Sequence, residues 1–105
     1  MTVNDLDIDD LKAGLADGSI LLVDVREPHE FAAGHIPGAV SRPLSVFDPA
    51  ELPSEPGRRV VFSCAAGVRS RHALAFAQAA GLPIDSHYVG GFKDWAMRGE
   101  PVSFD

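Results

Sequence analysis

Apolar residues gather in short, unbroken runs along the chain, and these runs predict the strands of a sheet. Ile20–Val25 and Arg59–Ser63 are nearly continuous apolar segments without polar alternation. That pattern is typical of strands covered on both faces, as in a parallel sheet. Ala39–Ser41 and His87–Val89 predict two further short strands.

Segments with helical spacing lie between these strands. Asp7–Leu15 places its apolar residues on one face and begins with an aspartate that suits a helix N-terminus. The other predicted helices are Pro28–Ala33, Ser70–Ala80 and Phe92–Arg98. Strands that alternate with helices predict an α/β fold, with a small, mainly parallel β-sheet flanked by helices on both faces.

The segment from Pro43 to Gly57 interrupts this alternation. It contains four prolines and therefore predicts a connection with one helical turn at most. No internal repeat is present in the chain. We therefore expect residues 1–105 to form a single domain.

Charge narrows the classes of partner. Nine basic and fifteen acidic residues give a net charge of −6, which disfavours nucleic acid and anionic membranes as partners. The first ten residues hold four aspartates and no basic residue, unlike a signal or transit peptide. No apolar run approaches the ~18 residues of a membrane span. We expect a cytoplasmic protein with no membrane or nucleic-acid partner.

The chain contains one cysteine, Cys64. A single cysteine excludes an intramolecular disulfide, a zinc site with several cysteines of this chain, and a CxxC redox pair. Two interpretations remain for Cys64, namely a small buried apolar residue or a reactive thiol.

The position of Cys64 favours the reactive thiol. It follows a predicted strand and precedes a predicted helix, and ligands of open α/β sheets usually bind at such junctions. Backbone N–H groups of the loop and the helix N-terminus would stabilise a thiolate, and Gly67 permits the loop to curl around the sulfur. Residues 56–84 also lack acidic residues but contain four arginines, which favours a small anion as substrate: Arg58, Arg59, Arg69 and Arg71.

Three stretches of the chain resemble the single-domain rhodaneses, a family of sulfurtransferases. They are LLVDVREPHEFAAGHIPGAV at 21–40, VVFSCAAGVRS at 60–70 and YVGGFKDWAMRGEPV at 88–102. The spaced combination of DVRE, GHIPGA, CxxGxRS and GGxxxW is specific, although each motif alone is weak. The resemblance is strongest over residues 21–102 and implies a rhodanese-like fold.

The resemblance also implies a chemistry for Cys64. Cys64 would take a sulfane sulfur from a donor such as thiosulfate, become a persulfide, and pass the sulfur to cyanide or a thiol. Arg26 would border the active site and help to bind anionic donors. The loop that would hold the sulfur comprises Ala65, Ala66, Gly67, Val68 and Arg69. We expect no cofactor and no metal.

This chemistry does not depend on a general base. A thiolate attacks a soft sulfur atom, and sulfite leaves as a stable anion. Arg69 and the loop amides should stabilise the anionic sulfur. The lack of an obvious Cys-His-Asp set therefore does not count against the sulfurtransferase interpretation. Ser70 either donates to the sulfur, caps the following helix, or does both.

Other functions remain open. Cysteine phosphatases and arsenate reductases use a Cys-x5-Arg loop, whereas Arg69 follows Cys64 after four residues, so this shorter loop suits one sulfur atom. A regulatory binding module would usually lack the cysteine, but a persulfide carrier for a partner protein would retain it. Ala65 and Ala66 replace a basic residue that thiosulfate-active members often carry, so a persulfide donor also stays open.

Two other features of the sequence have structural interpretations. The four histidines, His29, His35, His72 and His87, include no pair with helical spacing and do not predict a metal site. Asp24 lies at a strand end, where we expect structural hydrogen bonds with an arginine.

Overall fold

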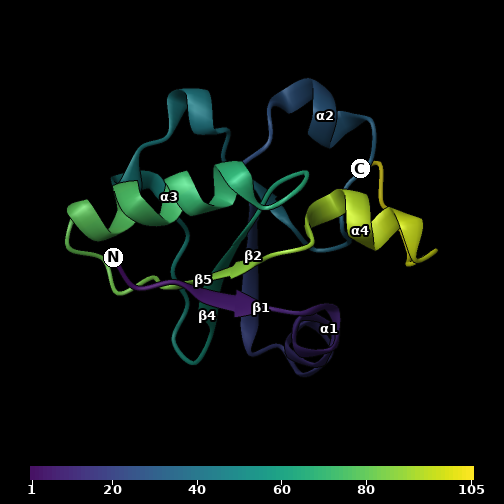
Figure 1. Cartoon of the computed structure of the whole chain (residues 1–105), viewed down its shortest axis with the longest axis horizontal. Coiled ribbons are helices and arrows are strands. Elements are labelled where there is room, and N and C mark those ends of the chain that lie inside the picture. The colour runs from purple at the N-terminus through teal and green to yellow at the C-terminus, as the bar shows by residue number, and fades with distance from the viewer.

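A five-stranded parallel sheet forms the centre of the computed structural model, which describes residues 1–105 (Figure 1). The strand order is β1-β5-β4-β2-β3, and all four strand pairs are parallel. The strands are β1 (Asn4–Leu6), β2 (Ile20–Asp24), β3 (Val40–Ser41), β4 (Arg59–Ser63) and β5 (Ser86–Tyr88).

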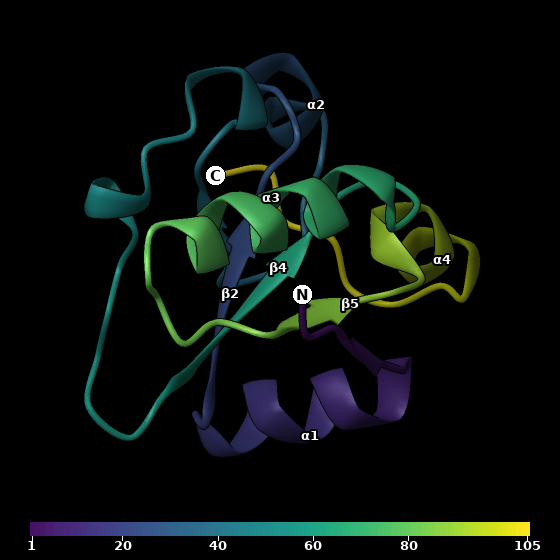
Figure 2. The same cartoon turned by 60° about the vertical axis from the view of Figure 1, so that its left-hand side comes forward.

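Helices cover both faces of this sheet, as the sequence predicts. Helix α1 lies against one face and α3 against the other (Figure 2). The helices are α1 (Ile8–Asp17), α2 (Pro28–Ala32), α3 (Val68–Ala79) and α4 (Gly91–Met97). No helix has both the length and the apolar character that crossing a membrane requires.

The two faces of the sheet contribute to two separate cores. On one face, Leu22 of β2 and Val61 of β4 pack with Leu11 of α1 and Trp95 of α4. On the other face, a second group packs against α3: Val23, Val25, Phe62, Cys64, Ala73, Leu74 and Ala77. Successive residues of β2 and β4 therefore enter different cores, which is why these strands show no polar alternation.

Strand β1 is absent from the sequence prediction. It has three residues, of which only Leu6 is buried, so it has no apolar pattern to detect. The strand forms because its backbone pairs with the edge of β5. The Asn4 N–H donates to the Asp85 carbonyl at 2.7 Å, and the Val89 N–H donates to the Leu6 carbonyl at 3.2 Å.

The predicted start of α3 is too late. This helix begins at Val68, two residues earlier than predicted, and its N-cap is Gly67, whose φ is 87°. Ser70 therefore lies inside the first turn, so the capping role expected for it is wrong. The Pro-rich connection contains two short 3₁₀ turns, Leu44–Val46 and Pro49–Glu51, where the sequence predicts at most one turn.

Candidate active site

The thiol of Cys64 lies directly after β4, where the chain turns into α3. The Gly67 N–H donates to Cys64 Sγ at 3.1 Å, and Ser70 Oγ lies 3.5 Å from the same sulfur. The side chain of Cys64 is only 1% exposed. The sequence-predicted loop thus brings a backbone N–H donor and a hydroxyl group to one buried sulfur atom.

These donors alter the acidity of the thiol. Burial raises the pKa of Cys64, but the Ser70 hydroxyl and the backbone N–H groups of Ser70, Ala66 and Gly67 act against it. Their combined effect is larger and holds the pKa of the thiol below its ordinary value. A lowered thiol pKa is the property that a nucleophilic cysteine needs at neutral pH.

Two glycines make the turn around Cys64 possible. At Gly67, a Cβ atom would lie 2.5 Å from the Val89 carbonyl oxygen, and φ is 87°. At Gly91, φ is 69° and a Cβ atom would lie 2.4 Å from the Ala65 carbonyl oxygen. Only glycine combines a left-handed backbone with such close backbone approach.

The start of α4 also binds the cysteine loop directly. The Phe92 N–H donates to the Cys64 carbonyl at 2.8 Å, and the Lys93 N–H donates to the Ala65 carbonyl at 3.0 Å. The first turn of α4 therefore fixes the position of the cysteine loop from the C-terminal part of the chain.

Arg69 binds a carboxylate rather than the sulfur. Its Nη1 and Nη2 donate to the two oxygens of Glu30 on α2, at 2.6 and 2.9 Å. This bidentate pair lowers the pKa of Glu30 to about 2. The hydrogen bonds to Glu30, with a smaller contribution from the charge of Cys64, raise the pKa of Arg69. That Arg69 stabilises an anionic sulfur stays a prediction.

Arg26 lies inside the protein and is 4% exposed. Its Nη2 donates to Asp24 Oδ2 at 2.7 Å and to the Gly34 carbonyl at 2.8 Å, and its Nε also binds Asp24. The guanidinium carbon lies 4.4 Å from the centre of the Phe92 ring. The predicted pairing of Asp24 with an arginine is confirmed, whereas donor binding by Arg26 stays a prediction.

The four arginines of residues 56–84 do not form one positive site. Arg59 begins β4 and Cys64 follows its end, so the strand places them about 17 Å apart. Arg58 binds Glu55 at 2.7 Å and the Ile20 carbonyl at 2.7 Å, next to the start of β4. The positive stretch expected from the sequence is thus divided by the strand, because neighbours in sequence lie at opposite ends of the sheet.

The structure adds two residues that the sequence interpretation did not connect with Cys64. Ser70 Oγ lies 2.7 Å from His87 Nδ1, and His87 Nε2 lies 2.8 Å from Asp5 Oδ1. His87 is fully buried in β5, and Asp5 is its register partner in β1. No local motif contains this hydrogen-bonded chain, because it depends on the parallel pairing of the first and last strands.

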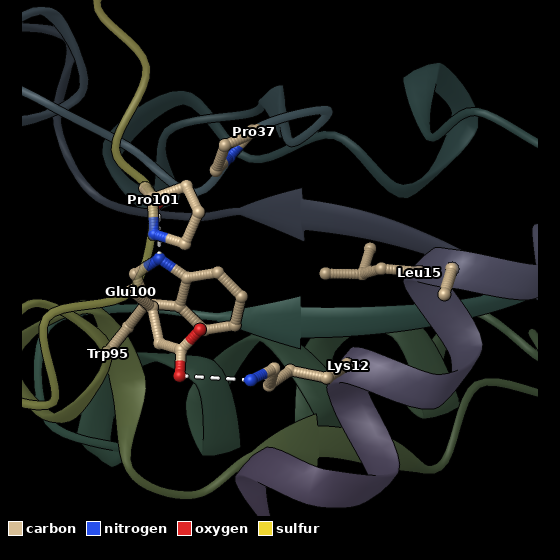
Figure 3. Close-up of a pocket in the computed structure, with 7 residues that line it drawn as sticks. Lys12, Leu15, Pro37, Trp95, Glu100 and Pro101 are labelled. Carbon is tan, nitrogen blue, oxygen red and sulfur yellow. Dashed lines mark hydrogen bonds and ion pairs between the residues drawn. The ribbon is translucent and has the colours of Figure 1, made fainter.

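The surface hollows of the protein lie away from Cys64. Four are present, and none is lined by Cys64. One of about 370 Å³ lies between α1 and the segment after α4 (Figure 3). There Lys12 Nζ and Glu100 Oε2 form a 3.0 Å ion pair, and Trp95 Nε1 donates to the Pro101 carbonyl. The structure contains no group of three or more metal-ligating side chains arranged around a metal site.

The fold and the cysteine loop define a known class of domain. Residues 7–98 match the family model of the rhodanese-like domain. The chain belongs to the rhodanese-like family.

Named relatives indicate the class of reaction. A sulfurtransferase of Allochromatium vinosum is 37% identical over 103 residues, which cover 95% of this chain and 94% of that protein. A human thiosulfate:glutathione sulfurtransferase is 31% identical, with 85% of this chain and 90% of that protein covered. The structure of the human single-domain sulfurtransferase TSTD1 matches with a TM-score of 0.76 and 30% identity, over 90% of this chain and 96% of that chain.

The lengths of the relatives differ. The chain spans 47% of an uncharacterised Synechocystis protein that is 41% identical over 84 residues, which are 80% of this chain. Family membership and the sulfurtransferase relatives together support sulfur transfer as the general reaction.

Replacing Gly91 by alanine should disturb the cysteine loop, residues 65–69. The new Cβ would collide with the Ala65 carbonyl, so we expect the loop to shift and the pKa of Cys64 to rise. The thiolate titration, followed by ultraviolet absorbance, measures this change. Gly81→Ala is the matched control, because φ is 83° but nothing lies within 4 Å of the new atom. In both variants, backbone strain should lower the free energy of unfolding by about 1–2 kcal/mol. Identical thiolate titrations in the two variants would contradict the role of Gly91.

Replacing Arg26 by methionine should mainly destabilise the fold. Asp24 is 3% exposed and would remain buried without its partner, so we expect a loss of about 3–5 kcal/mol in the free energy of unfolding. Urea denaturation measures the loss. The exposed Arg71, changed to methionine, serves as control and should alter stability by about 0.5 kcal/mol or less. A stable Arg26→Met variant with weakened thiosulfate binding would instead support the donor-binding role.

Proposed function

We propose that this chain is a thiosulfate sulfurtransferase that carries a sulfane sulfur as a persulfide on Cys64. The observation that carries the proposal is the set of donors around Cys64 Sγ, which lowers the pKa of the thiol. The thiolate attacks the outer sulfur of thiosulfate, and the sulfur–sulfur bond breaks as sulfite leaves with the electron pair. Cyanide or a thiol then attacks the terminal sulfur and restores the Cys64 thiolate.

The loop also fits the product of the first step. A persulfide anion keeps one negative charge next to the position of the original thiolate, so the same N–H donors can stabilise it. The name of the human thiosulfate:glutathione sulfurtransferase supports thiosulfate as donor and a low-molecular-weight thiol as acceptor. The expected cytoplasmic location stays a prediction.

Entry of the donor requires movement of the side chains around the thiol. Cys64 is 1% exposed, whereas a nucleophile must approach its target atom to about 3–3.5 Å. The side chains that shield Cys64 from solvent must therefore move apart during the proposed cycle. A protein that carries the persulfide to a partner would share the first half-reaction, with a protein thiol as acceptor.

Intact-mass measurement tests the persulfide directly. After exposure to thiosulfate or polysulfide, the wild-type chain should gain one sulfur atom, and cyanide should remove it. Cys64→Ser is the control and should gain nothing, because Cys64 is the only thiol. If no sulfane donor adds this mass to the wild-type chain, the proposed function is wrong. Aryl-phosphate hydrolysis that depends on Cys64 would instead support the phosphatase alternative.

Replacing Arg69 by alanine tests its predicted role in stabilising the anionic sulfur. We expect slower persulfide formation with an intact fold, because the Arg69–Glu30 pair is partly exposed. Unchanged rates would contradict the role.

The same variant should change the acid titration of Glu30. The pKa of Glu30 should rise from about 2 towards its ordinary range, which NMR titration measures. Since this folded-state pKa is lowered, the pair stabilises the fold above the unfolded pKa of about 4.3. In the wild type this stabilisation is lost as the pH falls towards 2.

A further inference from the structure

A buried chain of hydrogen bonds leads from the thiol to the surface of the sheet edge. It runs from Cys64 Sγ to Ser70 Oγ at 3.5 Å, then to His87 Nδ1 at 2.7 Å, and from His87 Nε2 to Asp5 Oδ1 at 2.8 Å. Cys64, Ser70 and His87 are at most 1% exposed, whereas the Asp5 side chain is 53% exposed. This series of hydrogen bonds thus begins at the sulfur of Cys64 and ends at the solvent-exposed carboxylate of Asp5.

We propose that His87, oriented by Asp5, accepts the proton of the Cys64 thiol through the hydroxyl of Ser70. The proposal deepens the proposed function, since it concerns how the sulfur nucleophile of that site is generated. His87 and Asp5 act through Ser70 and are positioning residues for the thiol.

Every hydrogen bond between Cys64, Ser70, His87 and Asp5 is made both before and after this proton transfer. In the thiol state, the Cys64 S–H donates to Ser70 Oγ, the Ser70 O–H donates to His87 Nδ1, and His87 Nε2–H donates to Asp5. The thiol proton then moves from Cys64 Sγ to Ser70 Oγ, while the Ser70 hydroxyl proton moves to His87 Nδ1. Cys64 becomes a thiolate that accepts from the Ser70 hydroxyl. His87 then becomes an imidazolium that donates to both Ser70 and Asp5. The proton that Cys64 loses is balanced by the proton that His87 gains.

The placement of Asp5 suits this transfer. Asp5 and His87 are register partners in the parallel pair β1–β5, so the backbone of the sheet sets their distance. A carboxylate at 2.8 Å holds the ring with Nδ1 facing Ser70 and stabilises an imidazolium. A buried imidazolium without such a partner would be costly.

Through the sulfur-transfer cycle, the imidazolium can remain as the counter-ion. Attack of the thiolate on thiosulfate forms a persulfide anion and releases sulfite, and attack by cyanide restores the thiolate with release of thiocyanate. Each step conserves one negative charge at Cys64, so no proton has to return to the sulfur between the steps.

Two ion pairs lie near the thiol. Arg69 at the start of α3 binds Glu30 of α2, with Glu27 nearby. At the end of β2, Arg26 binds Asp24. On the strand face that contacts α3, the neighbour of His87 in β4 is the uncharged Phe62. The two test variants below, at His87 and Asp5, leave both of these ion pairs unchanged.

The test is the pH titration of the Cys64 thiolate in two variants. His87→Asn keeps a polar atom near the position of Nδ1 for Ser70 but cannot take up a proton. Asp5→Asn keeps an acceptor for Nε2–H but removes the negative charge. We expect the titration midpoint to rise by about one pH unit in His87→Asn and by less in Asp5→Asn. Persulfide formation should be about tenfold slower at acidic pH in His87→Asn and should equal the wild-type rate at alkaline pH. A purely structural role would lower the rate at every pH.

Two controls separate the hydrogen-bonded chain from a general effect of charge. Asp10→Asn removes the same charge from an exposed position on α1, and its titration midpoint should equal that of the wild type. In a Ser70→Ala background, the hydrogen-bonded path from Cys64 to His87 is broken, so adding Asp5→Asn should cause no further change in the titration midpoint of the thiolate. If His87→Asn fails to fold, Asp5→Asn carries the test, because its side chain is half exposed.

Two results would overturn the proposal. One is a wild-type titration in both Asp5→Asn and His87→Asn, and the other is an effect of Asp5→Asn that persists in the Ser70→Ala background. The titration needs no sulfur donor, so a wild-type chain that gains no sulfur mass would refute the proposed function without affecting this readout.

Discussion

The turn from β4 into α3 is the constraint on which the site depends. Between Ser63 and Val68 the chain must leave a buried strand, place donors around a sulfur and start a helix. Gly67 makes this possible through its left-handed backbone and its close approach to the Val89 carbonyl. Gly91 permits a second close approach, at the Ala65 carbonyl. The segments that look like separate motifs in the sequence are therefore parts of one packing arrangement.

Two ion pairs lie close to the sulfur, in a chain of net charge −6. Asp24 binds Arg26 inside the protein, and Glu30 binds Arg69 beside the loop. An anionic sulfur in this setting gains stability mainly from fixed N–H and O–H dipoles, which need no reorganisation when the charge appears. The Gly67 N–H donates directly to Cys64 Sγ, and the Ser70 hydroxyl lies 3.5 Å from the same atom. Local dipoles thus matter more at this site than the excess of arginine in the surrounding sequence.

The sequence predicts the central part of the fold well because burial there leaves a strong pattern. The strand at Arg59–Ser63 is correct to the residue, and the predicted Ile20–Val25 is one residue longer than β2. The cysteine loop is placed correctly because it connects two such clear elements. Strand β1 is not predictable in this way, since three residues with one buried side chain carry no periodic signal.

Interactions between distant elements set the limit of prediction at the site. The partner of Arg69 lies on α2, and the partner of His87 lies in β1, 82 positions away in the sequence. The first contact depends on where α2 lies relative to α3, and the second depends on the pairing of β1 with β5, and no local pattern contains either. The sequence interpretation therefore finds the thiol but not the chain of hydrogen bonds behind it.

Strand β1 has a consequence for how this domain can vary among relatives. Residues 7–98 match the family model, and Asp5 lies two residues before the start of that match. Its strand pairs only with β5, at the outer edge of the sheet. A half-exposed side chain at the edge of a sheet can be exchanged without repacking a core, so a substitution at Asp5 would alter the surroundings of His87 and leave the residues around Cys64 in place. The margin of the sheet is thus a place where one substitution reaches the proposed proton acceptor, His87, without changing the cysteine loop.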